Sequence, residues 1–425
     1  MKTELHKYRI TPGIVQTQKQ TTIRISALET QLVFSDDTAY RVEVCGLTRL
    51  PWGDFKPKNN TFHMKAENGE LVFAYTFELE EEYYVRVFND TEKKCFLQMS
   101  VYALEEDLYT LRPLKGDFHV HSCRSDGKES PAVVAANYRE AGFDFMAVTD
   151  HHRYFPSVEA QEAYKGVPLG MLLLNGEEVH SPDNYVHVIH FGGDSSVNAL
   201  FEHDQDKYYD EVQAIIETND LPHFDKFAYA ANMWVAAKIR ETNGLAVFCH
   251  PHWINDTYNV PDSLSRAFLE NGVFDAFELI GGQTAHENNM QTAFYYQLRS
   301  EGVKIPVTGA SDSHGTINRG LFNKMFTIVF AAANARDDIL DAVKNCLSVA
   351  VEVYEDSVNY SAHGSYRLVS YARFLIEHYF SLTERICREE AILMRAHLCG
   401  DHQATQRLEQ LKEKTDAFYK LYAGK

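Results

Sequence analysis

Imidazole and carboxylate side chains recur at the ends of apolar runs between residues 118 and 314. Two of them, His119 and His121, alternate along a strand-like run, so both imidazoles project from one side and can grip one ion. The candidate ligands of this series are His119, His121, Asp126, His151, Glu178, His187, His250, Asp312 and His314. Each motif alone is weak, because a single His-x-His pair is more often structural than metal-binding. The set is stronger, since each motif falls where a strand meets its loop.

The chemistry of this set is that of a metal-dependent hydrolase. Imidazole together with carboxylate suits zinc, manganese or iron, and not magnesium alone. One tetrahedral zinc uses four ligands, so the size of the set predicts two or three divalent ions joined by bridging carboxylates. Such ions lower the pKa of bound water from about 16 to about 7, and no serine or cysteine nucleophile is required.

Seven short apolar runs position these residues, and helix-like stretches separate them. The runs cover residues 118–120, 145–148, 171–174, 186–191, 245–248, 274–280 and 304–307. A helix is predicted after the first run, with Ser130 as its N-cap, Pro131 at its first position and Gly142 past its end. Strands that alternate with helices indicate a parallel α/β sheet or barrel, and seven strands favour a barrel. Barrel enzymes assemble their sites at strand ends, where the candidate ligands lie.

The flanking regions have different patterns. Residues 20–104 alternate apolar and polar side chains around turn residues, which predicts a β-sandwich domain over residues 1–112. The barrel is expected over residues 113–355. Residues 356–425 read as a helical extension that docks on the barrel or on another subunit of a homo-oligomer. The barrel carries an insertion at 194–244, which is either a lid or specificity element, or an ordinary crossover helix with a decoration.

Composition narrows the classes of partner. The formal net charge of −19 argues against a nucleic-acid polymer, although bound ions would still allow a small anionic substrate. No apolar run reaches the roughly 18 residues of a membrane span, and the N-terminus lacks the apolar core of a secretory signal. We therefore expect a cytoplasmic protein that acts on a small molecule and does not contact membranes. The seven cysteines form no Cys-x-x-Cys pair, so neither a disulfide framework nor a cysteine zinc site is indicated.

The order of the motifs resembles that of a known family. Phe-His-Val-His-Ser-x-x-Ser-Asp-Gly, Val-Thr-Asp-His, Gly-Glu-Glu-Val, His-Val-Ile, Cys-His-Pro and Ser-Asp-Ser-His follow one another along the chain. Residues 116–335 are in this respect similar to the PHP (polymerase and histidinol phosphatase) superfamily. The resemblance implies a distorted (β/α)7 TIM-like barrel, the PHP fold, with three metal ions at the carboxyl ends of its strands.

The resemblance also implies a ligand set for each ion. The first would be held by His119, His121, Glu178 and Asp312, and the second by Glu178, His187 and His250. The third would be held by Asp126, His151 and His314. Glu178 is preferred to the adjacent Glu177 because it fits the family's Gly-x-Glu pattern. His187 and His190 are three apart on one strand and face opposite sides, so only one of them is expected to reach the site, and His187 fits the pattern better.

Further residues beside the ligands are candidates for catalysis. His152 and His252 could supply a proton or contact substrate, or could be structural. Arg124 and Arg319 could bind a phosphate oxygen, or could be exposed to solvent. Asp150 is expected to point away from His151 and to have a supporting role. Cys123 and Cys249 are expected to face the barrel wall, and no function is expected for His180, His203, His223 and His286.

Three functions are compatible with these residues. The leading hypothesis, which the resemblance implies and Arg124 and Arg319 support, is a phosphoesterase acting on a small phosphomonoester or phosphodiester. The second is a carboxylic ester or carbamate hydrolase, because the sandwich-plus-barrel layout and His-Pro-His-Trp at 250–253 resemble a branch of the superfamily with those activities. Trp253, Trp234 and Tyr185 could then form an apolar pocket, although burial in the core is favoured for Trp234. The third is a non-catalytic scaffold that retains a metal site, which the complete ligand set disfavours.

Overall fold

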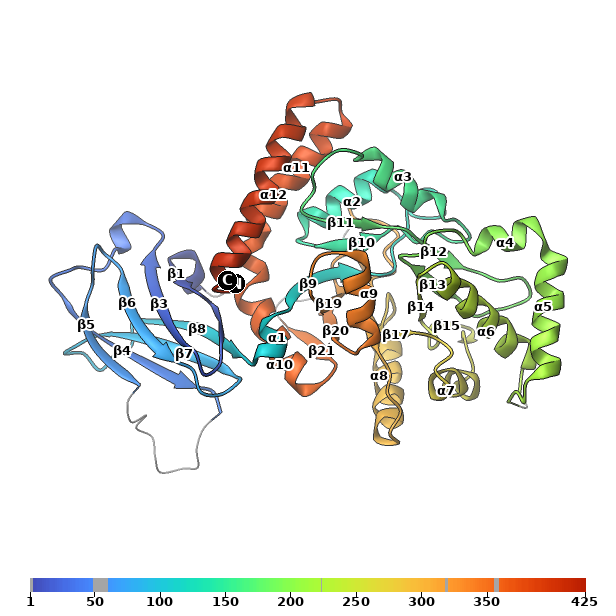
Figure 1. Ribbon diagram of the computed structural model, residues 1–425, viewed down its shortest axis with the longest axis horizontal. Helices are drawn as coiled ribbons and strands as arrows, with labels where there is room; N and C mark the ends of the chain where they lie inside the picture. The colour runs from blue at the N-terminus through green and yellow to red at the C-terminus, as the bar shows by residue number, and fades with distance from the viewer. Residues whose placement is uncertain (1–2, 49–59, 223, 318–319, 355–358) are drawn as a thin grey trace. The chain divides into compact units, whose positions relative to one another are not determined.

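The computed structural model describes residues 3–48, 60–222, 224–317, 320–354 and 359–425, and the chain divides into two compact units. The first comprises Met1–Leu111, Val369–Ile386 and Gln410–Lys425, and the second comprises Arg112–Leu368 and Cys387–Glu409. The C-terminal helices α10 (Tyr366–His378), α11 (Phe380–Leu398) and α12 (His402–Tyr422) therefore contribute residues to both units (Figure 1). No helix of the described segments is long and apolar enough to cross a membrane.

The first unit contains two sheets that share one core. One sheet has the order β1-β3-β6 and the other β2-β8-β7-β4-β5. Their alternation matches the sequence, since Ile23 and Ile25 of β3 are buried in the same core as Val42 and Val44 of β4. The strands are β1 (Tyr8–Thr11), β2 (Ile14–Gln16), β3 (Gln20–Ala27), β4 (Ala39–Gly46), β5 (Thr61–Lys65), β6 (Leu71–Thr76), β7 (Glu82–Asn89) and β8 (Leu97–Leu104). Short helical turns η1 (Thr3–His6), η2 (Thr30–Leu32) and α1 (Glu106–Tyr109) accompany them.

The second unit is a mixed α/β structure, as predicted, with two main sheets. The first sheet has the order β11-β10-β9-β19-β20-β21 and the second β12-β13-β14-β17-β18. Isolated parallel bridges join the two sheets, Val120 to Ser313 and His151 to Glu178. The described strands thus form two bridged sheets rather than one continuous ladder, and a closed seven-stranded barrel stays a prediction.

The elements of the second unit follow the predicted alternation of strands and helices only in part, because among the described residues no helix separates β11, β12 and β13, or β18 and β19. Its strands are β9 (Arg112–Asp117), β10 (Phe145–Ala147), β11 (Leu172–Leu174), β12 (Gly176–Val179), β13 (Val188–Phe191), β14 (Leu245–Phe248), β15 (Ile254–Asn255), β16 (Thr257–Tyr258), β17 (Ala276–Ile280), β18 (Val307–Gly309), β19 (Met325–Ala331), β20 (Ser348–Val353) and β21 (Tyr360–His363). Its helices are α2 (Pro131–Glu140), α3 (Phe155–Ala163), α4 (Asn198–His203), α5 (Gln205–Thr218), α6 (Lys226–Glu241), α7 (Asp262–Glu270), α8 (Ala285–Ser300) and α9 (Arg336–Lys344). As predicted, α2 begins with Ser130 at the N-cap and Pro131 in its first turn, and Gly142 follows with a left-handed φ of 85°.

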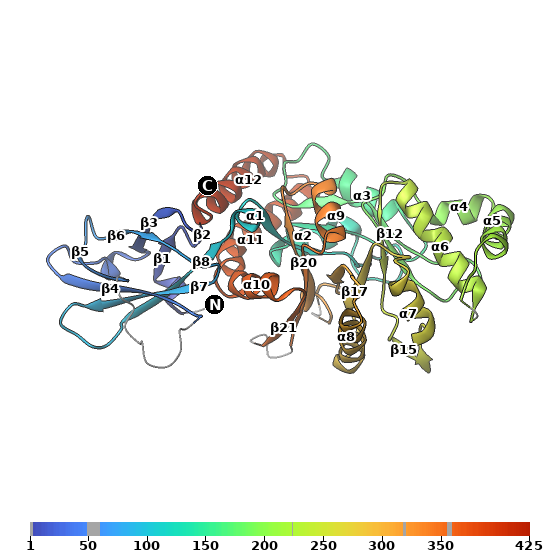
Figure 2. The ribbon, with the colours of Figure 1, turned by 60° about the horizontal axis from the view of Figure 1, so that its bottom comes forward.

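The direction of β13 corrects the expectation of a parallel sheet. It runs antiparallel to both β12 and β14. The segment 180–187 between β12 and β13 is too short for the dozen or more residues that a parallel crossover needs, so it forms a hairpin. The amino end of β13 consequently lies at the sheet edge where β12 and β14 end. The insertion after β13 forms α4, α5 and α6, and α5 lies along α6, which packs on β14 (Figure 2).

Candidate metal centre

The bridged edge of the two sheets gathers the predicted ligands from distant parts of the chain. His119 and His121 follow β9, and His151 follows β10. Glu178 lies in β12 and His187 precedes β13, while the remaining three strand-end residues, His250, Asp312 and His314, follow β14 and β18. Asp126 comes from the loop after His121. In this loop a side chain at Gly127 would lie 2.7 Å from the carbonyl oxygen of His121, so the turn requires glycine.

Glu178 is the centre of the cluster and is fully buried. Its Oε2 atom lies 3.4 Å from His119 Nε2, 3.5 Å from His121 Nε2 and 2.6 Å from His151 Nδ1. Its Oε1 atom lies 2.9 Å from His187 Nδ1 and 3.5 Å from His250 Nε2. One carboxylate therefore faces imidazoles on two sides, which is the arrangement of a bridging ligand.

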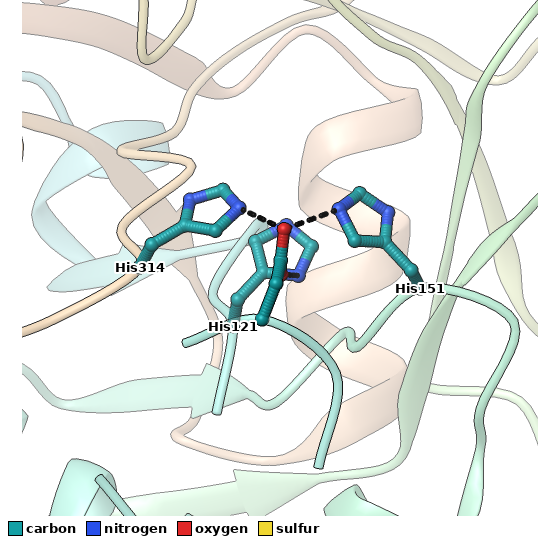
Figure 3. A group of neighbouring side chains, drawn as sticks. His121, His151 and His314 are labelled. Atoms are coloured by element: carbon teal, nitrogen blue, oxygen red, sulfur yellow. Dashed lines mark ion pairs between the residues drawn. The ribbon is translucent and has the colours of Figure 1, made fainter. Parts of the chain in front are cut away.

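Asp312 and Asp126 close the cluster at its other borders. Asp312 Oδ1 lies 3.3 Å from His119 Nε2 and 3.0 Å from His121 Nε2. Asp126 Oδ2 lies 3.6 Å from His151 Nε2 and 3.3 Å from His314 Nε2. Figure 3 shows His121, His151 and His314 gathered around this carboxylate oxygen.

The side chains of the cluster are arranged as ligands of divalent cations rather than as hydrogen-bond partners of one another. Both carboxylate oxygens of Glu178 and Asp312 Oδ1 are buried and make no hydrogen bond, despite the imidazole nitrogens around them. The Nε2 atoms of His119 and His121 face each other at 3.0 Å. Buried acceptors without donors cost about 1–3 kcal/mol each, and a shared cation satisfies them together. The donor set therefore suits divalent metal ions.

The electrostatics of the cluster reflect the same crowding. Burial lowers the pKa of His119, but Asp312, Glu178 and Glu278 outweigh it and raise that pKa well above its usual value. Burial raises the pKa of the Asp312 carboxyl, but the neighbouring imidazoles, His119 foremost, hold it well below its usual range. Burial lowers the pKa of His121. The neighbouring imidazoles thus favour the ionised form of Asp312, which is the form that binds metal.

Backbone strain accompanies the site. Among the residues with left-handed φ angles are His152 at 60°, His250 at 30° and Asp312 at 49°. None is glycine, and such conformations cost about 1–3 kcal/mol each. Strain of this kind concentrates at functional sites, where the surrounding structure holds side chains in a required direction.

Parts of the chain are similar to known proteins. No protein-family model matches the chain. Over 93 residues the chain is 32% identical to the DNA polymerase/3'-5' exonuclease PolX of Bacillus subtilis (strain 168), a match that covers 21% of this chain and 16% of that enzyme's length. A Bacteroides vulgatus structure, described as a two-domain protein containing a predicted PHP-like metal-dependent phosphoesterase, is 21% identical with a TM-score of 0.40. That match covers 60% of this chain and 76% of the other.

An amidohydrolase from Chromobacterium violaceum is 18% identical, with a TM-score of 0.33, over 48% of this chain and 88% of the other. The resemblance to the PHP superfamily is confirmed. The branch with carbamate and ester hydrolases is not established by these likenesses.

The structure separates the alternatives left open within the PHP motifs. Glu178 and His187 lie in the cluster, whereas Glu177 and His190 form a buried network on the opposite face. Glu177 accepts hydrogen bonds from the Val197 amide at 2.5 Å and from Asn198 Nδ2 at 3.0 Å, and its Oε1 lies 2.9 Å from His190 Nδ1. Alternation along β12 and β13 therefore divides metal-facing from structural side chains.

Glu278 was not predicted as part of the site. It lies on β17, fully buried, with Oε2 at 3.0 Å from His119 Nδ1. A carboxylate in this position fixes the ring orientation of a metal-binding histidine and increases its basicity. The run 274–280 contains two acidic residues, Asp275 and Glu278, of which only Glu278 lies within β17.

His180 was expected to be an ordinary histidine, and this expectation is wrong. Its Nε2 atom lies 3.0 Å from His151 Nδ1 and 3.4 Å from Glu178 Oε1. Burial lowers the pKa of His180 to about 4, so its imidazole is neutral at neutral pH. The missed signal is its spacing, two residues after Glu178 along an extended segment, the same spacing that pairs His119 with His121.

The predicted catalytic residues are less uniformly placed. His152 lies beside His180, with ring centroids 4.3 Å apart and ring planes tilted by 44°. His252 turns toward Asp262, whose Oδ1 lies 3.2 Å from its Nε2, and Arg124 donates to both oxygens of Glu159 at 2.8 Å. Among the described residues, no hydrogen bond, ion pair or ring contact links the side chain of His252 or of Arg124 to the cluster. Arg319, like His223, lies outside the described residues.

Neighbouring residues complete the surroundings. Asp150 accepts from the Ser122 amide at 2.7 Å and from Ser125 Oγ at 2.6 Å, so it has the expected supporting role in shaping the loop to Asp126. The Cys249 thiol is buried and donates to the His187 carbonyl at 3.1 Å. It also groups with His119 and His250, so the expectation that it faces away from the site is wrong. Trp234 is in the core, as favoured.

Proposed function

We propose that this protein is a hydrolase that uses two or three divalent ions, zinc, manganese or iron, to cleave a small phosphomonoester or phosphodiester. One observation carries the proposal. The predicted donors converge on Glu178, whose two buried oxygens make no hydrogen bond while imidazoles surround both. A protein without a functional metal site would not be expected to retain these buried carboxylate oxygens, because buried acceptors without hydrogen-bond donors are destabilising.

The division of labour among the side chains follows from the geometry. When bound, the ions supply Lewis acidity that lowers the pKa of water and polarises a phosphoryl or carbonyl oxygen. Glu178 and Asp312 would provide carboxylate ligands, and Glu278 holds the His119 ring in its orientation. His152, which is exposed beside the cluster, is the candidate for donating a proton to the leaving group.

A phosphoester substrate is favoured by charge and by the sequence match. The cluster would concentrate positive charge at one edge of a chain whose net charge is −19, so a small anion is the substrate that this edge selects. The relative matched over 93 residues is named a 3'-5' exonuclease, an activity that breaks phosphodiester bonds. The same negative net charge disfavours a polymer substrate for this chain.

A carboxylic ester or carbamate is the second candidate, and Trp253 is the observation that favours it. Its ring lies 5.8 Å from that of His250 and 6.3 Å from that of His187, and the residue is 38% exposed. An exposed indole beside the cluster offers an apolar surface to an aryl or alkyl group. Arg124, paired with Glu159, is not directed at a substrate phosphate.

The test is a metal count combined with a substrate panel on the full-length protein. We expect at least two tightly held ions per chain and hydrolysis of phosphomonoesters or phosphodiesters that depends on zinc or manganese. Esterase activity without phosphoesterase activity would transfer the assignment to the second candidate. Full metal loading without hydrolysis of either class would indicate a scaffold, and fewer than two ions would refute the multinuclear site.

A further inference from the structure

The two oxygens of Glu178 face equal numbers of imidazoles. Oε2 faces the three rings of His119, His121 and His151. Oε1 faces three others, with His187 Nδ1 at 2.9 Å, His180 Nε2 at 3.4 Å and His250 Nε2 at 3.5 Å. The family motifs account for every member of both groups except His180.

The position of His180 is built into the hairpin. In the β12–β13 register Glu178 pairs with Ile189 and Val179 with Val188, so one further step sets His180 opposite His187. The two rings are in contact, with centroids 3.9 Å apart. The backbone is fixed as well, because Asn198 accepts from the His180 amide at 3.3 Å and donates to the Glu178 carbonyl at 3.0 Å.

We propose that His180 is a fourth protein ligand of the ion on the Oε1 side of Glu178. With His187, His250 and Glu178 it makes a set of three imidazoles and one carboxylate, the number of donors that closes a tetrahedral zinc site. This inference rests on the proposed metal-dependent function. It implies that the Oε1-side ion would have four protein donors, as would the ion beside Asp312. The ion assigned to Asp126, His151 and His314 would have three and would keep a position for water or substrate.

His180 could instead act only through His151, whose Nδ1 lies 3.0 Å from its Nε2. Such a positioning residue would weaken the ion held by His151 by about 10–100-fold but would leave the donors of the Oε1-side ion unchanged. The absorption spectrum of a cobalt-loaded protein reports the donors themselves and separates the two roles, whereas a fall in affinity or activity alone does not.

The experiment compares wild type with His180→Asn, His180→Asp and His203→Ala in the full-length protein. Asn and Asp have the same shape, but only Asp restores an anionic metal donor. His203 is exposed on α4 and is the matched control. Each protein is equilibrated with zinc in chelator buffers, and bound zinc is counted. The visible spectrum is then recorded after loading with cobalt.

We expect His180→Asn to bind one tightly held zinc more than about 100-fold more weakly, because losing a ligand costs more than losing a residue that orients one, and to change the cobalt spectrum. His180→Asp should recover most of the affinity, and His203→Ala should match wild type. An unchanged cobalt spectrum in His180→Asn would overturn the inference, even if zinc affinity or activity falls. His180→Ala repeats the test if the Asn variant does not fold. A wild-type protein without tightly bound ions would refute the proposed function itself.

Discussion

At the scale of single residues, adjacent side chains of β12 have opposite tasks. Glu178 points into the cluster and its oxygens make no hydrogen bond, whereas Glu177 is fully satisfied by donors on the other face. Because successive strand residues project to opposite sides, neighbours with the same chemistry can serve binding and stability separately. This pair provides a matched test within one dipeptide.

Glu178→Gln should abolish hydrolysis and release at least one ion, while the metal-free protein keeps its stability because a buried charge has been removed. Glu177→Gln should retain the ions and most activity but lower the free energy of unfolding by about 1–3 kcal/mol, since donors to Glu177 lose an ionised acceptor. Metal content, hydrolysis rate and urea unfolding are measured for both. A fully active Glu178→Gln protein would contradict the bridging role.

The sequence predicted the gathered donors because each sits in a short local motif, such as Ser-Asp312-Ser-His314. Glu278 could not be found in the same way, because its partner His119 is 159 residues distant in sequence and only the fold brings them together. His180 was within reach of local reasoning. Its alternation with Glu178 was visible, but no motif contained it.

At the scale of elements, the apolar runs 145–148, 186–191, 245–248 and 274–280 located β10, β13, β14 and β17 but not their directions, whereas the run 118–120 lies just after β9. The run containing β13 is buried on both faces, and such a run is compatible with parallel or antiparallel pairing. The short 180–187 connection was the physical clue to a hairpin. The antiparallel direction explains why His187 lies at the start of its strand while its partners lie at or after the ends of theirs.

The contact between β7 and α10 in the first unit predicts a dependence on pH. Burial raises the pKa of Glu82, but hydrogen bonds from His378 and Ser100 and the charge of Arg373 outweigh it and lower the pKa from 4.5 to about 2. Because the folded pKa is lower than the unfolded one, this stabilisation is complete above about pH 4.5 and is lost as the pH falls toward 2. The full effect is about 3 kcal/mol.

Urea unfolding of the intact protein between pH 6 and about 2 measures this loss. Glu82→Gln should remove about 3 kcal/mol of the pH dependence of the first unit's free energy of unfolding. His203→Ala, which removes a titratable group from the second unit, should leave the profile of the first unit unchanged. An unaltered slope in Glu82→Gln would show that other carboxylates control acid unfolding.

At the scale of the whole molecule, stability and metal binding are distributed unequally between the two units. The core of the first unit is made by sandwich strands and includes none of the predicted ligands. The second unit has its own cores and contains all of the cluster. A ligand stabilises only the unit whose folded state it binds.

Calorimetry of the intact protein should therefore show two transitions, of which chelation shifts one. At an ion concentration a thousandfold above the dissociation constant, binding contributes about 4 kcal/mol, which corresponds to a shift on the order of 10 °C for a unit of this size. Chelators should lower the melting temperature of the second unit by that amount, because the buried ligand atoms around Glu178 lose their cation. Adding zinc should restore the melting temperature. Glu82→Gln should move only the other transition. An equal shift of both transitions on chelation would contradict this expectation. It would mean that the two units unfold cooperatively and that the metal stabilises the sandwich as well as its own unit.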